Sequence, residues 1–204
     1  MPKTREQNQL IKEERRNSIL ICSLYLFALK GYSSVNIDDV TKAAKCSHGL
    51  FYHYFKDKEE LFFSVIEEVA LKQFIPLINS INYNQKAKFA IHDLLNCLYE
   101  ILVGNNKNLV CILYLLFNLH LQKDNIPKPK DINKKNKPLL VYWLLIDLIK
   151  KGQIEGDIND GNPKVYAVAI LSMITGLSFN RLYIGLKRFV CPTPEIIMNI
   201  LIKK

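Results

Sequence analysis

The sequence predicts an all-α fold, in which an N-terminal three-helix head with a helix-turn-helix precedes a C-terminal helical body. Three observations lead to this prediction. Apolar residues recur at spacings of three and four, and no stretch keeps the period of two that is typical of strands. Three capped helix starts, at Asn36, Ser47 and Asp57, follow one another closely. Hydrophobic residues make up 49% of the 204 residues, which is enough for a substantial core.

The first helix is expected over residues 13–30. Its apolar residues Ile19, Leu20 and Phe27 recur at helical spacing and mark the side that faces the core. Gly31 follows directly, and a glycine with positive φ commonly ends a helix at this position. The helix is therefore expected to end at Lys30.

Three further helix starts complete the head. Asn36, with Asp39 three residues later as a short analogue of the capping-box acid, predicts a helix over 37–44. Ser47 can cap a second short helix over 48–55. Asp57, with Glu60 at the third helical position, forms a capping box for a long helix that starts at Lys58. We therefore divide the chain into a head, residues 1–57, and a body, residues 58–204.

The body is expected to consist of longer helices. Their predicted ranges are 58–80, 85–104, 107–122, 138–152, 163–186 and 194–203. Pro76 is expected to kink or split the first of them, because proline lacks the amide that a helix interior needs. Six lysines and three prolines between Lys123 and Pro138 predict a mobile loop.

Composition excludes several classes of protein. The polar start of the sequence has no apolar segment that would indicate a secretory signal. The longest apolar run, Val165 to Phe179, is shorter than the roughly 20 residues of a membrane span, so no membrane partner is expected. Nucleotide-binding and hydrolase motifs are missing, and the four histidines do not have the spacing of metal ligands. We therefore expect neither an enzyme nor a metal or other cofactor.

Charge and cysteines add less. The net charge of +9 suggests nucleic acid as a partner, but residues 1–60 carry only +2 of it, so basicity alone does not locate a DNA surface. Five cysteines without a C-x-x-C pair are typical of reduced thiols in the cytoplasm. They are Cys22, Cys46, Cys97, Cys111 and Cys191.

The segment from Asn36 to Tyr54 has the pattern of a helix-turn-helix. Such a motif needs a bracing helix, a tight turn and a reading helix whose N-terminal residues reach the base edges of the major groove. Val40 and Ala44 are expected to face the interior from the bracing helix. Gly49, at the front of the reading helix, permits a close approach to DNA. Short donors and acceptors lie at the same front, namely Ser47, His48, Tyr52 and His53.

From Ile19 to Phe62 the sequence reads ILICSLYLFALKGYSSVNIDDVTKAAKCSHGLFYHYFKDKEELF. Its Gly-Tyr, its Ser-x-Gly-x-x-Tyr and its Lys-Glu resemble, without a gap, the head of the TetR family of transcriptional repressors. The resemblance implies that Tyr52 and Lys58 bind backbone phosphate, and that other residues touch phosphate or base edges. The full set of expected DNA contacts is Asn36, Thr41, Ser47, His48, Gly49, Tyr52, His53 and Lys58.

Three residues depart from the family pattern. Lys45 and Cys46 replace the usual Gly-Val of the turn, and Thr41 replaces an alanine. Lysine is less suited than glycine to a turn that needs positive φ, so the turn geometry is the open point. Cys46 is more simply a small buried residue than a redox switch, and the sequence leaves that choice open.

The body resembles the family in its order of helices, and members of that family bury their last two helices in a four-helix bundle between subunits. Small residues on one face of helix 163–186 are the expected homodimer seam, namely Ala169, Ser172, Thr175 and Gly176. Packing within one chain is the alternative. The resemblance also implies a pocket for a small hydrophobic effector among the middle helices. Its candidates are Cys97, Tyr99, Tyr114, Phe117, His120, Tyr142, Trp143 and Met173, each of which is otherwise a core residue.

The sequence thus predicts a cytoplasmic regulator of transcription, most simply a repressor. It would bind a palindromic double-stranded operator as a homodimer and leave it when the effector binds. The alternative is an architectural or nonspecific DNA-binding protein without an effector, whose affinity would fall with salt but depend little on sequence.

Overall fold

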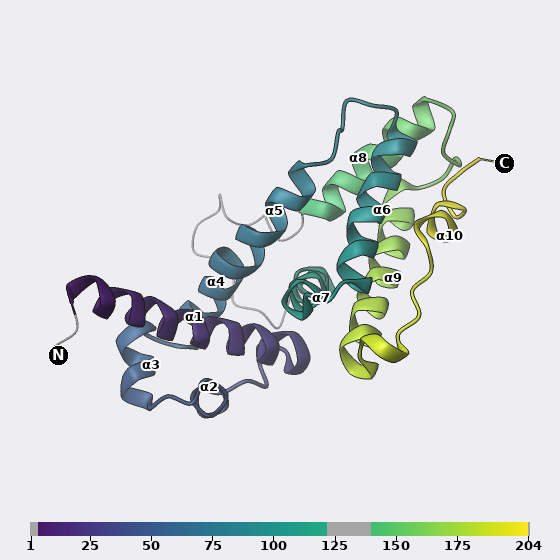
Figure 1. The fold of residues 1–204 in the computed structure, drawn as a ribbon. Helices are drawn as coiled ribbons and strands as arrows, with labels where there is room; N and C mark the ends of the chain where they lie inside the picture. The colour runs from purple at the N-terminus through teal and green to yellow at the C-terminus, as the bar shows by residue number, and fades with distance from the viewer. Residues whose placement is uncertain (1–3, 122–139, 204) are drawn as a thin grey trace.

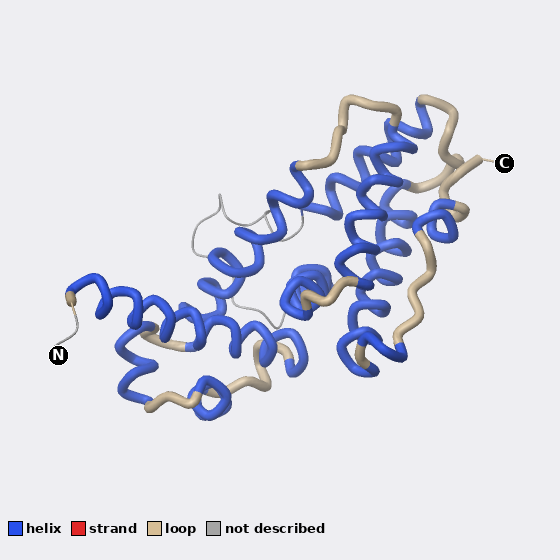
Figure 2. Tube along the Cα trace, viewed as in Figure 1, coloured by secondary structure: helices blue, strands red, loops and turns tan. Residues whose placement is uncertain are grey.

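The computed structural model describes residues 4–121 and 140–203, and within these residues the regular elements are all helices (Figures 1 and 2). The head contains α1 (Arg5–Lys30), α2 (Ile37–Ala44) and α3 (His48–Tyr54). The connection to the body contains α4 (Lys58–Ser64), the π-helical segment η1 (Val65–Leu71) and α5 (Lys72–Asn79). The body contains α6 (Ala87–Val103), α7 (Lys107–Leu121), α8 (Leu140–Ile154), α9 (Pro163–Ile184), the 3-10 turn η4 (Leu186–Arg188) and α10 (Pro194–Met198). The predicted all-α fold is confirmed.

The first helix starts earlier than the sequence predicts. Thr4 and Gln7 form a capping box: the Thr4 hydroxyl accepts from the Gln7 amide at 3.2 Å, and the Gln7 side chain accepts from the Thr4 amide at 3.0 Å. α1 therefore begins at Arg5 and not near residue 13. The prediction was wrong because the first two turns are polar, so no apolar periodicity marks them. These turns extend beyond the rest of the head (Figure 1).

The core of the head is aromatic. Phe27 of α1 meets Phe62 of α4 edge to face, with ring centroids 5.1 Å apart, and Tyr32 meets the same ring at 4.9 Å. Phe51 and Phe55, at 0% and 1% exposed, anchor α3 against this core. Buried rings of this size stabilise a small domain strongly, so the three head helices form one rigid unit with the start of α4.

The predicted helix over 58–80 has the right extent but not one register. α4 changes into the π-helical segment at Val65 and returns to α-helix at Lys72, with Pro76 inside α5. Arg16 of α1 binds Glu68 of this segment with both guanidinium nitrogens, at 2.5 and 2.7 Å. The head is thus tied to the π-helical part of the connection.

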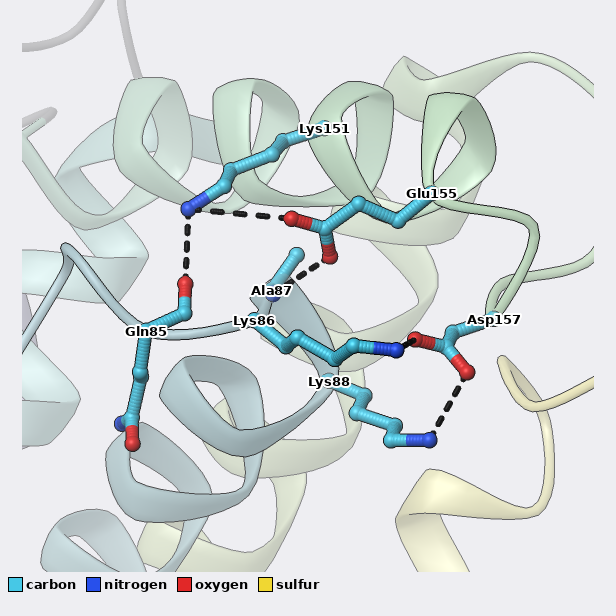
Figure 3. Close-up of polar contacts among 7 residues, drawn as sticks. All are labelled: Gln85, Lys86, Ala87, Lys88, Lys151, Glu155 and Asp157. Atoms are coloured by element: carbon cyan, nitrogen blue, oxygen red, sulfur yellow. Dashed lines mark hydrogen bonds and ion pairs between the residues drawn. The ribbon is translucent and has the colours of Figure 1, made fainter.

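The helices of the body pack side by side, with α7 between α1 on one side and α9 on the other (Figure 1). A polar cluster fastens the end of α8 to the start of α6 (Figure 3). Lys151 donates to the Gln85 carbonyl at 2.7 Å, and Glu155 accepts from the Ala87 amide at 2.7 Å, which caps α6. Asp157 pairs with Lys88 at 2.7 Å.

The C-terminal part of the body differs from the prediction in length. The helix expected over 194–203 ends at Met198, because the chain turns there and Ile202 forms a bridge with Ile158. α9 ends at Ile184, where Gly185 takes a φ of 78°. The predicted mobile loop from Lys123 to Pro138 lies outside the described residues.

Candidate nucleic-acid interface

The bracing helix α2 begins with the reciprocal cap that the sequence predicts. The Asn36 side chain accepts from the Asp39 amide at 2.7 Å, and the Asp39 carboxylate accepts from the Asn36 amide at 3.2 Å. The hydrogen bond from the Asn36 backbone and the adjacent Lys30 ammonium lower the pKa of Asp39. Because its side-chain oxygen holds this cap, Asn36 has limited freedom to bind DNA through that atom.

The turn between α2 and α3 depends on a left-handed residue. Lys45 has φ 50° and ψ 50°, so the strained geometry that the sequence left open is present. The Cys46 amide then donates to the Thr41 carbonyl at 3.0 Å, which closes the turn. A lysine here costs conformational energy that a glycine would not. The turn is tight enough to place α3 directly after α2.

The reading helix α3 exposes a continuous front. Ser47 caps it by accepting from the Leu50 amide at 3.1 Å, as predicted. His48, Gly49 and His53 are exposed, and the Tyr52 side chain is 54% exposed. A Cβ added at Gly49 would have only the Ser47 hydroxyl within contact distance, so this side of α3 is open. The front therefore presents an imidazole, bare backbone, a phenol and a second imidazole to solvent.

Two predicted contact residues are engaged inside the head. Thr41 is only 5% exposed, and its hydroxyl donates to the Asp38 carbonyl at 3.1 Å, so we remove it from the contact set. Its burial explains why a small residue is needed there. Lys58 is half-buried and donates to the carbonyls of Tyr32 and Val35, at 3.0 and 2.8 Å.

An acidic neighbour at the front was not expected. The His48 imidazole lies 2.9 Å from the Asp38 carboxylate of α2, and both side chains are exposed. The sequence assigned Asp38 only to the positive end of the α2 dipole, since the distance across the turn is not visible in the pattern. The ion pair orients His48 at the entrance to the front.

The cysteine in the turn has the properties of an inert thiol. Burial raises the pKa of Cys46, with a further increase from Cys22 nearby. Burial also raises the pKa of Cys111 to about 12. Because the thiolate is the reactive form, these thiols are weak nucleophiles at neutral pH, which favours the packing role over the redox switch.

The residues predicted to line a pocket are divided between the interior and the surface. Phe117 is buried and packs edge to face on Phe74, with centroids 6.2 Å apart. Trp143 is 46% exposed on α8, so we remove it from the pocket set. The side chain of His120 lies outside the described residues. The remaining candidates are half-buried: Cys97, Tyr99, Tyr114, Tyr142 and Met173.

A groove of about 370 Å³ lies elsewhere, between α6 and α10. It is lined by Lys88, Phe89, His92, Glu195, Met198, Asn199 and Ile202. None of these belongs to the predicted pocket, which therefore stays a prediction. The groove faces solvent, and the His92–Glu195 pair at 3.2 Å spans it.

Helix α9 carries an apolar and small-residue face that nothing covers within the described chain. Val165, Val168, Phe179 and Tyr183 are 63, 40, 47 and 81% exposed. The predicted seam residues Ala169, Ser172 and Gly176 are exposed on this helix as well, whereas Thr175 is half-buried and donates to the Leu171 carbonyl at 2.7 Å. An exposed apolar stripe of this kind marks a contact surface.

The length of α9 also raises the question of a membrane. The helix has 22 residues, and its most apolar 18-residue window has a mean hydropathy of 1.4 and is 33% buried. By length and composition it is able to cross a membrane, although the sequence predicted no span. One such helix is weak evidence, because a helix buried between soluble subunits meets the same criterion.

Residues 22–65 match the sequence profile of the bacterial regulatory proteins of the tetR family. The matched range begins within α1 and ends at the start of the π-helical segment, so it contains the whole candidate interface. Over 127 residues the chain is 27% identical to an uncharacterized HTH-type transcriptional regulator, YuxN of Bacillus subtilis. The alignment covers 62% of this chain and 41% of YuxN, so the chain spans about two fifths of that relative.

Solved structures share the fold over nearly the whole chain. A mutant of HlyIIR, with residues 170–185 of that protein substituted by alanine, matches with a TM-score of 0.71 at 18% identity and full coverage of both chains. A transcriptional regulator of Saccharomonospora viridis, in complex with choline, matches with a TM-score of 0.61 at 16% identity. That alignment covers 94% of this chain and 100% of the other. At these identities the likeness establishes the fold.

Proposed function

We propose that this chain, which its residues 22–65 place in the TetR family of transcriptional regulators, is a repressor that binds a palindromic DNA operator as a homodimer. The observation that carries the proposal is the exposed front of α3. Four consecutive-turn positions, His48, Gly49, Tyr52 and His53, face solvent, while Phe51 on the opposite side is fully buried. A helix held so firmly by its inner side can insert its outer side into a groove without losing its position.

The chemistry of this front suits DNA. Imidazoles and a phenol donate and accept hydrogen bonds at phosphates and base edges, and Gly49 lets the helix backbone approach closely. Ser47 holds the cap of α3 and offers its remaining lone pair and hydroxyl proton at the same end. We keep Lys58 as a candidate phosphate contact only in a complex in which it leaves the carbonyls of Tyr32 and Val35.

The homodimer is supported by α9. Two reading helices must meet major-groove faces about 34–36 Å apart, or a multiple of that distance, and a rigid dimer supplies the separation. The exposed stripe of α9 is apolar along its length and small in its middle, at Ala169, Ser172 and Gly176. Small residues allow two helices to approach closely, so we propose that α9 packs against its copy. The five-residue α10 is too short to contribute a full helix to a four-helix bundle.

We further propose that a small hydrophobic effector binds among the middle helices and releases the DNA. Half-buried Cys97, Tyr99, Tyr114, Tyr142 and Met173 would line the site together with buried Phe117. Sulfur and aromatic side chains with a few hydroxyls suit an apolar ligand with a small polar or cationic group. The choline complex of the Saccharomonospora viridis regulator supports a ligand of this class.

The proposal is tested by capture from a pool of random duplexes, sequenced before and after selection. A repressor enriches one palindromic sequence, and its affinity for that sequence exceeds its affinity for a scrambled duplex by a factor of at least about 10³ at physiological salt. An architectural protein enriches no sequence, and its affinity for every duplex falls steeply with salt. The second outcome would replace the proposed function by the alternative.

A further inference from the structure

The head is joined to the body by a hydrogen bond between helices far apart in sequence. Tyr25 of α1 donates its phenolic proton to the side-chain oxygen of Asn108 at 2.7 Å, across 83 residues of chain. The Lys107 ammonium lies 5.3 Å from the centroid of the same ring. Burial raises the pKa of Tyr25, so the hydroxyl stays protonated and able to donate at neutral pH. The start of α7 is thus fixed to the middle of α1.

The other end of this connection is fixed by a buried arginine. Arg181 of α9 is 5% exposed and donates from Nε to the Leu102 carbonyl at 3.1 Å and from a terminal nitrogen to the Gly104 carbonyl at 3.2 Å. These carbonyls lie at the C-terminal end of α6, where the helix dipole favours a cation. The arginine therefore holds the turn between α6 and α7 against α9.

The turn between these two anchors has little freedom. A Cβ at Gly104 would lie 2.7 Å from the Glu100 carbonyl, so only glycine fits there without movement of the backbone. Asn106 then caps α7 by accepting from the Leu109 amide at 3.2 Å. Two residues further along is Asn108, the partner of Tyr25. A displacement of α9 is therefore passed through this short turn to α1.

We propose that Arg181, Asn108 and Tyr25 are positioning residues, which together hold each head at a fixed place relative to α9 and so determine the half-site spacing that the dimer accepts. The inference rests on the proposed function, because α9 is the proposed seam between subunits. It does not follow from DNA binding by α3 alone. One extra base pair between half-sites moves them about 3.4 Å apart and turns one by about 34°, so a rigid joint rejects it and a loose joint tolerates it.

The test uses the operator selected by the wild-type protein and versions with one base pair inserted or removed at its centre. Wild type should bind these versions at least about tenfold more weakly, because both reading helices no longer fit. Tyr25→Phe and Asn108→Leu each remove the hydrogen bond, and each should reduce the discrimination to about threefold or less. The double variant should behave like either single variant, since both remove the same bond.

Three variants control for a merely structural effect. Asn108→Asp keeps an acceptor for the Tyr25 hydroxyl and should retain the wild-type discrimination. Tyr83→Phe removes a phenol that donates to the Ile78 carbonyl at 2.6 Å, far from the joint, and should also behave as wild type. Arg181→Lys leaves one cation in place of a fork of donors and should give an intermediate result. Sedimentation should find every variant as dimeric as wild type.

The result that overturns the inference is specific. Tyr25→Phe with unchanged spacing preference, or with equally weakened binding to all spacings, would show that the bond does not set the spacing. Loss of discrimination in Asn108→Asp would also overturn it. If the wild-type protein selects no duplex at all, the proposed function fails instead, so the two failures are distinguishable.

Discussion

Replacing Lys58 by methionine separates two roles for this residue. Methionine keeps an apolar stem of similar length but loses the ammonium, which donates to the carbonyls of Tyr32 and Val35 and lies 4.3 Å from the centroid of the Tyr32 ring. A hydrogen bond from a charged donor stabilises a fold by about 1.5–3 kcal/mol. The turn that carries these carbonyls is partly exposed, so water replaces much of the loss. We expect the free energy of unfolding to fall by about 2 kcal/mol in total.

The assay is urea denaturation followed by circular dichroism, with a melting curve on the same samples. A loss of about 2 kcal/mol corresponds to a decrease in Tm of about 4–8 °C for a chain of this size. Lys56→Met is the matched control: Lys56 is exposed, and its hydrogen bond to Glu60 comes from the backbone amide, which the change leaves intact. If Lys58→Met unfolds within about 0.5 kcal/mol of wild type while DNA binding weakens, Lys58 acts as a phosphate contact and the clamp is refuted.

Three other changes test separate parts of the account. Lys45→Gly should raise the free energy of unfolding by about 0.5–1 kcal/mol, because glycine adopts φ 50° without a Cβ penalty, and lower stability in urea would contradict this. Glu68→Gln should destabilise the protein by less than about 1 kcal/mol at neutral pH. The Arg16 hydrogen bond lowers the pKa of Glu68 from 4.5, so this stabilisation exists above that value and disappears as the pH falls through the lower folded pKa. A difference between variant and wild type that persists in strong acid would exclude that cause. Gly176→Arg should give monomers in sedimentation, and Gln73→Arg on exposed α5 should not; an unchanged dimer in Gly176→Arg would move the seam away from α9.

Local chemistry explains which parts of the head could be predicted from the sequence. The caps at Asn36, Ser47 and Asp57 each act on an amide three residues later, so the pattern contains both partners. The capping box predicted at Asp57 is correct in only one direction. Glu60 returns its bond to the Lys56 amide at 2.7 Å and not to Asp57. The helices of the head followed from these caps to within a residue, apart from the start of α1.

Contacts between distant residues could not be predicted in this way. The role of Lys58 was taken from its place in the family motif, but the carbonyls that it binds lie 26 and 23 residues away along the chain. Nothing in the spacing of Tyr25 and Arg181 marks them as partners of α7 and of the end of α6. Arg181 was hidden inside an apolar helix, where a single cation has no periodic signal. Such residues are found only when the helices are packed.

The exposed face of α9 shows a mixed result. The sequence identified small residues at the right spacing, and three of the four are exposed. It missed the larger residues Phe179 and Tyr183 on the same helix, whose rings stack with centroids 6.0 Å apart. A helix that is apolar on all sides gives no moment from which to choose the outer face.

The central claim is that the exposed front of α3 reads DNA. The most direct measurement compares the wild type with the double variant His48→Ala/His53→Ala on the selected operator and on a scrambled duplex of equal length. Both imidazoles are exposed, so the fold should be retained, and His92→Ala at the distant α6–α10 groove is the control. We expect operator affinity to fall at least about tenfold, since a base contact contributes about 1–3 kcal/mol, with scrambled binding nearly unchanged. Equal operator affinity in the double variant and the wild type would contradict the account.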